Sequence, residues 1–304
     1  HVGAAPGTAV RAGGGDRFIY FTAALAALNG LLFGFDTGII SGAFLYINDT
    51  FAMSPLVEGI VMSGAMAGAA LGAAVGGKLA DRLGRRRLIL IGAVVFFIGS
   101  LTMAVAPSVP VVAIGFASIV GPLYISEIAP PKIRGALTSL NQLMVTLGIL
   151  ISYFVNYAFA DAGAWRLMLG TGMIPAVVLA VGMVKMPESP RWLYEHGRHD
   201  DARTVLERTR DGSIEDELAE IEKTVTKQSG TSLQDLLQPW LRPALVVGLG
   251  LAVFQQITGI NAVIYYAPTI LESTGFGSAT SILATVGIGV INVVMTVVAI
   301  ALID

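Results

Sequence analysis

Long apolar runs restrict the fold of this sequence more than any other feature. A helix rises about 1.5 Å per residue, so about 20 apolar residues cross the roughly 30 Å hydrocarbon core of a bilayer. Eight runs approach this length: 18–47, 57–80, 88–106, 109–125, 136–159, 167–184, 244–271 and 278–303. The run 109–125 is the weakest, because its 17 residues rise only about 26 Å. We therefore expect an all-α integral membrane protein.

Composition supports this expectation and excludes several classes of function. The chain is 54% hydrophobic and 13% charged, whereas soluble domains carry roughly 25% charge. A net charge of −2 gives no basic surface for nucleic acid. Because Cys is absent, no disulfide, thiolate catalyst or Cys-ligated metal is expected. His196 and His199 lie beside Asp200 and Asp201, which we interpret as a solvated face, so we expect neither metal nor cofactor.

The positions of Lys and Arg predict the orientation. Residues 18–27 could be the apolar core of a signal peptide, but the apolar stretch continues to Ile47 with one charge, Asp36, which favours a transmembrane helix. Basic residues precede the first run, follow the second and fourth, and fill the segment after the sixth, whereas the opposite loops hold only Arg166. Cytoplasmic loops carry such an excess. We expect a multi-pass protein of the cell membrane with a cytoplasmic N-terminus.

These runs predict four parts: a cytoplasmic tail at 1–17, a six-helix half at 18–184, a cytoplasmic helical linker at 185–243, and two helices of a second half at 244–304. Within the linker, 200–210 and 215–227 are amphipathic. A separate regulatory domain is the alternative, but this segment has few large apolar residues for its own core.

A faint internal repeat supports two parallel copies of a six-helix unit. Residues 37–39 and 258–260 both read Thr-Gly-Ile, an offset of 221. Within two residues, the same offset relates Asp81 to Asp304. The second copy then contains only two helices, so we expect an incomplete copy of a longer bundle.

Asp36 is an ionisable residue within an apolar helix, and such a residue is a functional candidate by default. A desolvated carboxylate tends to bind a proton, so Asp36 can take up and release one as its exposure alternates. The alternative is a structural carboxylate that is hydrogen-bonded to the backbone or to Ser41.

The run 244–271 is unusually polar, and Gly259 interrupts it while Pro268 ends it. Amide side chains both donate and accept hydrogen bonds, as a neutral, hydroxyl-rich ligand requires, and tyrosine rings can stack on a sugar or close a gate. The amides and tyrosines are Gln255, Gln256, Asn261, Tyr265 and Tyr266, with Gln142 and Asn292 on other helices. The alternative is that these amides only cross-link membrane helices.

A third pattern is acid next to base at the ends of helices on the basic side. Asp81, Arg82 and Arg85 lie in a short loop around Gly84, which is either a topology signal or a conformational latch. Glu127 with Arg134, and Glu188 with Arg191, repeat the pattern. Three such pairs on one side favour the latch.

These residues resemble the sugar porters of the major facilitator superfamily over nearly the whole chain. The similar motifs are GFDTGIISG (34–42), DRLGRRR (81–87), YISEIAPPKIRG (124–135), NQL (141–143), PESPRWL (187–193) and QQITGINAVIYYAP (255–268). The resemblance implies alternating access by two six-helix halves, with sugar bound by Gln142, Gln255, Gln256, Asn261 and Asn292, a gate at Tyr265, a proton-linked Asp36, and a charge network of Asp81, Arg82, Arg85, Glu127, Arg134, Glu188 and Arg191.

The chain departs from the family pattern near Pro110, where the family has a Gly- and Arg-rich stretch. No charge lies between Arg87 and Glu127, so Asp36 lacks an obvious cationic partner and proton coupling is in question. We expect proton-coupled symport of a hexose or pentose; the alternatives are a facilitative uniporter and a non-transporting sugar sensor. We do not expect an enzyme, because Asp36 has no second acid among the helix interiors. By itself the chain should transport little or no sugar, since alternating access needs two halves.

Overall fold

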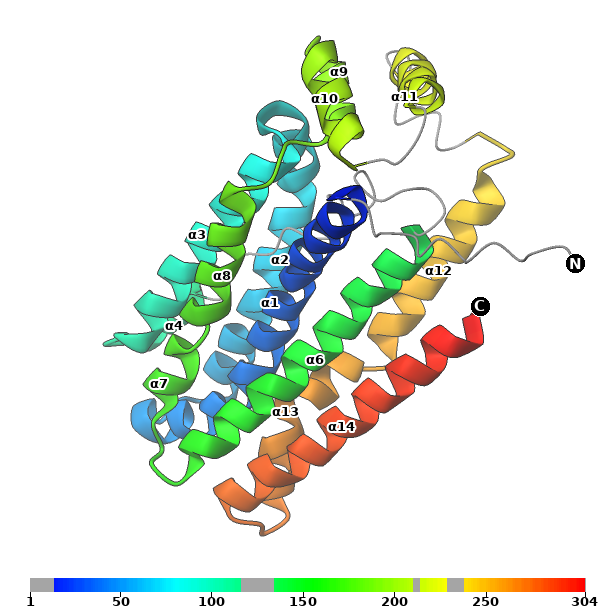
Figure 1. Ribbon diagram of the computed structural model, residues 1–304. Coiled ribbons are helices and arrows are strands. Elements are labelled where there is room, and N and C mark those ends of the chain that lie inside the picture. The colour runs from blue at the N-terminus through cyan, green and yellow to red at the C-terminus, as the bar shows by residue number, and fades with distance from the viewer. Residues whose placement is uncertain (1–13, 116–133, 210–213, 229–237, 304) are drawn as a thin grey trace, which may run out of the picture.

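The computed structural model describes residues 14–115, 134–209, 214–228 and 238–303, and all regular structure in these ranges is helical (Figure 1). The helices are α1 (Gly14–Phe51), α2 (Pro55–Leu83), α3 (Arg85–Ala104), α4 (Val109–Gly115), α6 (Arg134–Ala160), α7 (Trp165–Gly170), α8 (Met173–Val184), α9 (Pro190–Glu195), α10 (His199–Thr209), α11 (Glu215–Gln228), α12 (Arg242–Ile257), α13 (Ile260–Ser273) and α14 (Ser278–Ile303).

The predicted apolar helices are present wherever the structure describes them. Among the described residues, six segments are long and apolar enough to cross a membrane: Ala27–Phe51, Arg85–Ala104, Ser139–Ala160, Trp165–Val184, Arg242–Ser273 and Ser278–Leu302. The run 57–80 lies within the 29 residues of α2, which span about 44 Å. Only the first part of the run 109–125 is described, as α4, and the rest lies outside the described residues.

The run 244–271 forms two helices, and its interruption at Gly259 is confirmed. Gly259 adopts a left-handed φ of 73°, which costs little without a Cβ atom, so α12 stops at Ile257 and α13 begins at Ile260. The prediction that Pro268 ends the helix is wrong, because α13 continues through Pro268 to Ser273. Proline removes one N–H donor from a helix, but the helix can continue if the freed carbonyl finds another partner.

The run 167–184 also differs from a single helix, since α7 and α8 are separated at Thr171 and Gly172. Pro175 has no N–H for the carbonyl of Thr171 four residues earlier. The N–H of Ile174 donates to that carbonyl instead, at 3.0 Å. This tighter turn accounts for the break.

α1 and α6 lie against each other with their backbones in contact (Figure 1). A Cβ added at Gly34 would lie 1.9 Å from the carbonyl oxygen of Val145, and one at Gly148 would lie 2.2 Å from that of Leu31. The Asn156 amide of α6 also donates to the carbonyl of Gly38, at 3.1 Å. Small residues allow such close approach of membrane helices, so α1 and α6 form one closely packed pair.

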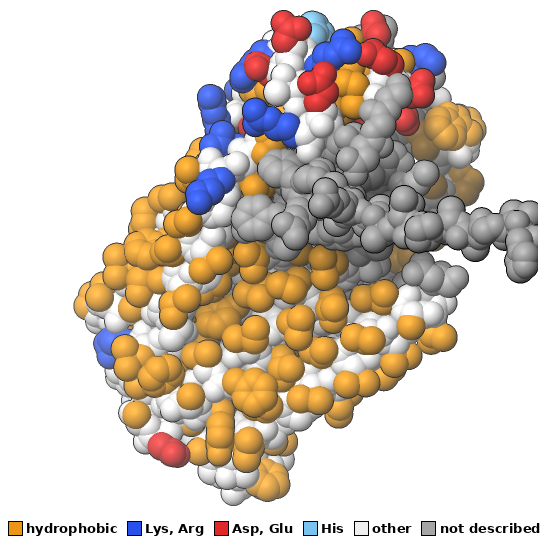
Figure 2. All heavy atoms as spheres, viewed as in Figure 1, with side chains coloured by type: hydrophobic (Ala, Val, Ile, Leu, Met, Phe, Trp, Pro, Cys, Tyr) orange, Lys and Arg blue, Asp and Glu red, His pale blue; other side chains and the backbone are white. Residues whose placement is uncertain are grey.

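The surface divides into an apolar body and a charged end (Figure 2). Large exposed apolar side chains lie on α3, α8, α12 and α14, for example Ile98, Val181, Leu251 and Ile291. Charged side chains gather at the end that carries α9, α10 and α11. An apolar body of this kind is the lipid-facing surface of a multi-pass membrane protein.

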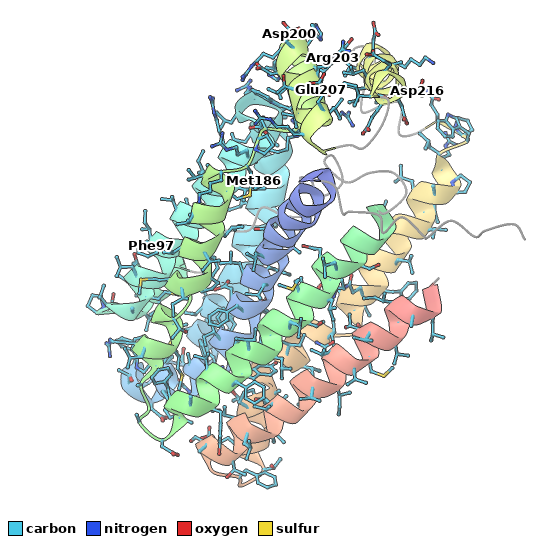
Figure 3. The ribbon with its side chains drawn as sticks, viewed as in Figure 1. Phe97, Met186, Asp200, Arg203, Glu207 and Asp216 are labelled. Atoms are coloured by element: carbon cyan, nitrogen blue, oxygen red, sulfur yellow. The ribbon has the colours of Figure 1, made fainter. Side chains whose placement is uncertain are left out.

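The predicted linker helices 200–210 and 215–227 are confirmed as α10 and α11, except that Arg210 lies outside the described residues. The short helix α9 was not predicted. Arg203 on α10 pairs with Glu207 on the same helix at 3.3 Å and also with Glu215 of α11, at the charged end (Figure 3). The four-part domain division and the cytoplasmic position of this end stay predictions.

Replacing Gly34 by Ala should separate α1 from α6. The added Cβ meets a backbone atom that cannot move alone, so we expect Gly34→Ala to cost about 1–3 kcal/mol or more, measured as a lower thermal unfolding midpoint in detergent. Gly92→Ala on α3 is the matched control, because a Cβ there has nothing within 4 Å. Equal midpoints for the two variants would contradict the contact.

Candidate functional site

A cavity of about 420 Å³ lies between α1 and α6 on one side and α12, α13 and α14 on the other. Its fourteen lining residues are Phe33, Asp36, Thr37, Gln142, Val145, Thr146, Ile149, Gln255, Gln256, Ile260, Asn261, Ile264, Tyr265 and Asn292. The structure therefore brings together all five predicted ligand-binding amides, the predicted proton-linked carboxylate and one predicted gate tyrosine.

The interruption between α12 and α13 is what aims several amides at the cavity. Gln255 and Gln256 lie in the last turn of α12, and Asn261 lies in the first turn of α13, just after Gly259. The Asn261 amide donates to the Gln256 side-chain oxygen at 3.0 Å. That bond orients one amide while leaving its other donors and acceptors for a ligand. Gln142 of α6 and Asn292 of α14 complete the polar lining.

Asp36 is 5% exposed and faces the cavity from α1. Ser41, the suggested structural partner, donates to the carbonyl of Gly38 at 2.8 Å. Among the described lining residues there is no Lys or Arg. The cavity thus holds one carboxylate among neutral amides, hydroxyls and apolar groups. Elsewhere in the described ranges, no group of three or more His, Asp or Glu residues is arranged to hold a metal ion.

The two predicted gate tyrosines have different positions. Tyr265 is 7% exposed, lines the cavity and packs in the buried cluster that contains Phe35 and Ile39 of α1. Tyr266 is partly buried against the same cluster but does not line the cavity. Tyr265 is therefore the one that lies between the ligand cavity and the contact of α1 with α13.

Seven cavity residues were not predicted. Thr37 and Ile260 directly adjoin Asp36 and Asn261 in the chain, and helical spacing could have found the other five. Phe33 lies three residues before Asp36, and Val145, Thr146 and Ile149 lie three, four and seven residues after Gln142. Residues at such spacings share a helix face. Ile264 lies three residues after Asn261 on α13.

The predicted charge network is partly described. Asp81 pairs with Arg85 at 2.9 Å, and the Arg85 side chain is buried. Arg191 pairs with Glu195 at 3.1 Å, a partner that was not predicted. Arg82 is exposed. Glu127 lies outside the described residues, and so does the side chain of Arg134, so their pairing stays a prediction.

The Glu188 carboxylate accepts hydrogen bonds from backbone N–H groups. Its predicted pairing with the Arg191 side chain stays a prediction. One of its oxygens accepts the N–H groups of Arg86 at 2.9 Å and Ser189 at 3.0 Å. The Arg86 side chain donates to the carbonyls of Met183 and Val184 at the end of α8. Trp192 of α9 donates its indole N–H to the carbonyl of Asp81 at 2.8 Å. The start of α3, the end of α2 and the segment after α8 are therefore tied together.

Comparison with known proteins identifies the family. The family model described as "Sugar (and other) transporter" matches residues 22–304. This chain belongs to that family. It is 48% identical to the glucose transporter GlcP of Staphylococcus epidermidis over 95% of this chain and 66% of that protein. It is 45% identical to the galactose-proton symporter of Escherichia coli over 94% of this chain and 64% of that protein.

A solved structure of a member of the major facilitator superfamily has the same fold. The proton:xylose symporter XylE bound to 6-bromo-6-deoxy-D-glucose superposes with a TM-score of 0.82 at 31% identity, covering 95% of this chain and 70% of that one. The helical bundle of the major facilitator superfamily is thereby shown. The chain spans about two thirds of the length of these family members.

Gly84 should be required for the contact with Glu188. It adopts a φ of 92°, and a Cβ there would lie 2.3 Å from a carboxylate oxygen of Glu188. We expect Gly84→Ala to displace this carboxylate and lower the thermal midpoint. The matched control is the same change in a Glu188→Ala background, where the backbone cost at φ 92° and ψ 153° remains but the carboxylate that would be displaced is absent. Gly84→Ala should cost about 1 kcal/mol more in the parent than in that background; equal losses in the two would show that the contact with Glu188 contributes nothing.

Proposed function

We propose that this chain takes part in proton-coupled transport of a neutral monosaccharide, a hexose or a pentose, across the cell membrane by alternating access. One observation carries the proposal: five amide side chains and one carboxylate from both sides of the bundle meet in a single cavity. The relatives that the chain resembles bear the names of a glucose transporter and a galactose-proton symporter.

The chemistry of the cavity fits a sugar better than a charged metabolite. Each amide offers both donors and acceptors to hydroxyl groups, while Phe33, Ile260 and Tyr265 offer apolar surface to the faces of a sugar ring. A phosphate or carboxylate ligand would need a cation, and the described lining has none while Asp36 would repel an anion. The volume lies within the range of small-molecule sites.

Asp36 is the group that would carry the proton. Burying its charge in an apolar helix bundle costs several kcal/mol unless a partner or a proton neutralises it. A cavity that opens to one side of the membrane hydrates the carboxylate, and closure favours its protonated form. Sugar and proton would then be bound and released together.

Two groups of contacts would control access to the cavity. Tyr265 would close it between α1 and α13, and the network of Asp81, Arg85 and Glu188 would hold the helix ends at the α9–α11 end, which we place in the cytoplasm. One observation favours facilitated diffusion as a second candidate: among the described cavity residues, no cation is available to exchange with the Asp36 carboxylate.

Removing single amides should weaken sugar binding. Gln142→Ala and Gln256→Ala should each raise the dissociation constant for the bound monosaccharide about 2- to 12-fold, the value of a lost neutral hydrogen bond, measured by calorimetry on the purified protein. Gln238→Ala removes an exposed amide outside the cavity and should leave the constant unchanged. Unchanged binding in both cavity variants would remove these residues from the site.

Replacing Asp36 by Asn should separate sugar movement from proton movement. Asn is similar in shape but carries no titratable proton, so in a chain extended to the full length of the family members we expect Asp36→Asn to abolish accumulation of radiolabelled sugar against its gradient while sugar binding remains. Loss of binding as well would point to a structural carboxylate. Accumulation at the original level would exclude Asp36 from proton coupling and leave facilitated diffusion or another carrier.

A further inference from the structure

Tyr153 of α6 is a buried tyrosine that neither the ligand site nor the charge network uses. It is 1% exposed and lies behind the cavity wall. Its ring packs with Ile149 of the same helix, Ile264 of α13 and Val286 of α14. A Cβ added at Gly289 of α14 would lie 2.9 Å from the ring. One side chain of α6 thus contacts both α13 and α14.

The hydroxyl of Tyr153 lies next to a backbone carbonyl, that of Ile264, which lacks its usual helical N–H donor. The carbonyl of Ile264 would normally accept the N–H of the residue four positions later. That residue is Pro268, which has no N–H. The Tyr153 hydroxyl lies 3.4 Å from the Ile264 carbonyl oxygen and donates to it. In the apolar interior, a carbonyl without a donor is costly.

The helix that carries Tyr153 is itself bonded to α1, because the Asn156 amide of α6 donates to the carbonyl of Gly38 at 3.1 Å. Ile264 lines the cavity, and the next residue is Tyr265, which packs against Phe35 and Ile39 of α1. The Tyr153 hydroxyl therefore joins the α1–α6 pair to the point of α13 that carries the candidate gate.

We propose that Tyr153 is a positioning residue whose hydroxyl replaces the helix donor lost at Pro268 and thereby holds α13 closed against α1 and α6. The bond at 3.4 Å is long for a hydroxyl–carbonyl pair, and when α13 moves the Ile264 carbonyl must find another donor, such as water in the opened cavity. Proline would thus make the position of α13 depend on a side chain of the other half. This inference rests on the proposed function only where it takes the movement of α13 to be a step of sugar transport.

Cysteine labelling can test the proposal without any sugar, so its failure and that of the proposed function are distinguishable. The chain has no native Cys, and Ala43 of α1 is 0% exposed within the cluster that contains Tyr265. The thiol of Ala43→Cys should react with a maleimide in detergent only when α13 separates from α1. Tyr153→Phe keeps the ring and removes the hydroxyl, and should speed this reaction about two- to tenfold.

Two further variants make the result specific. Tyr157→Phe removes a hydroxyl one turn away on the same helix, where the side chain is 43% exposed, and should not change the rate. Pro268→Ala supplies an N–H for Ile264, so in that background Tyr153→Phe should change the rate less than about 1.5-fold, well below the effect of one lost hydrogen bond.

An unchanged rate for Tyr153→Phe, or the same acceleration with and without Pro268→Ala, would overturn the proposal. If Tyr153→Phe loses the folded, monodisperse form, recovery of that form by Pro268→Ala would support the proposal, and failure to recover would contradict it.

Discussion

In the interior of a bilayer, each backbone carbonyl needs a donor from the protein, and this requirement shapes both halves of the described bundle. Regular helices meet it internally. The interesting positions are those where the sequence removes a donor: Pro175 leaves the carbonyl of Thr171 to the N–H of Ile174, and Pro268 leaves that of Ile264 to the Tyr153 hydroxyl. The first exchange is local. The second links helices that are far apart in the sequence.

The close pairing of α1 and α6 gives this arrangement a rigid support. Glycines bring the two backbones together, so Asp36 on α1 and Gln142 on α6 face the same cavity at a fixed separation. On the other side, the left-handed Gly259 ends α12 and begins α13. Amides from both helix ends can therefore reach the ligand. A continuous, closely packed pair of helices thus faces an interrupted one across the cavity.

Much of this fold and site could be predicted from the sequence, because apolar length and isolated polarity are strong constraints in lipid. The apolar runs predicted the helices, and polar residues within apolar helices, such as Gln255 and Asn292, predicted the lining of the cavity. What could not be predicted depends on neighbours in space. No spacing shows that Tyr153 contacts Ile264 or that Trp192 binds the carbonyl of Asp81. The continuation of α13 beyond Pro268 depends on the same kind of long-range contact.

The proposed function depends most on whether the cavity accepts a neutral sugar. The direct measurement is equilibrium binding of radiolabelled D-glucose, D-galactose and D-xylose to the purified protein, with D-glucuronate as a competitor of similar size. We predict saturable binding of at least one neutral sugar and no competition by glucuronate, whose carboxylate would meet Asp36 without a cation. No saturable binding of any of the three sugars, or competition by glucuronate as strong as that by the unlabelled sugar, would contradict the account.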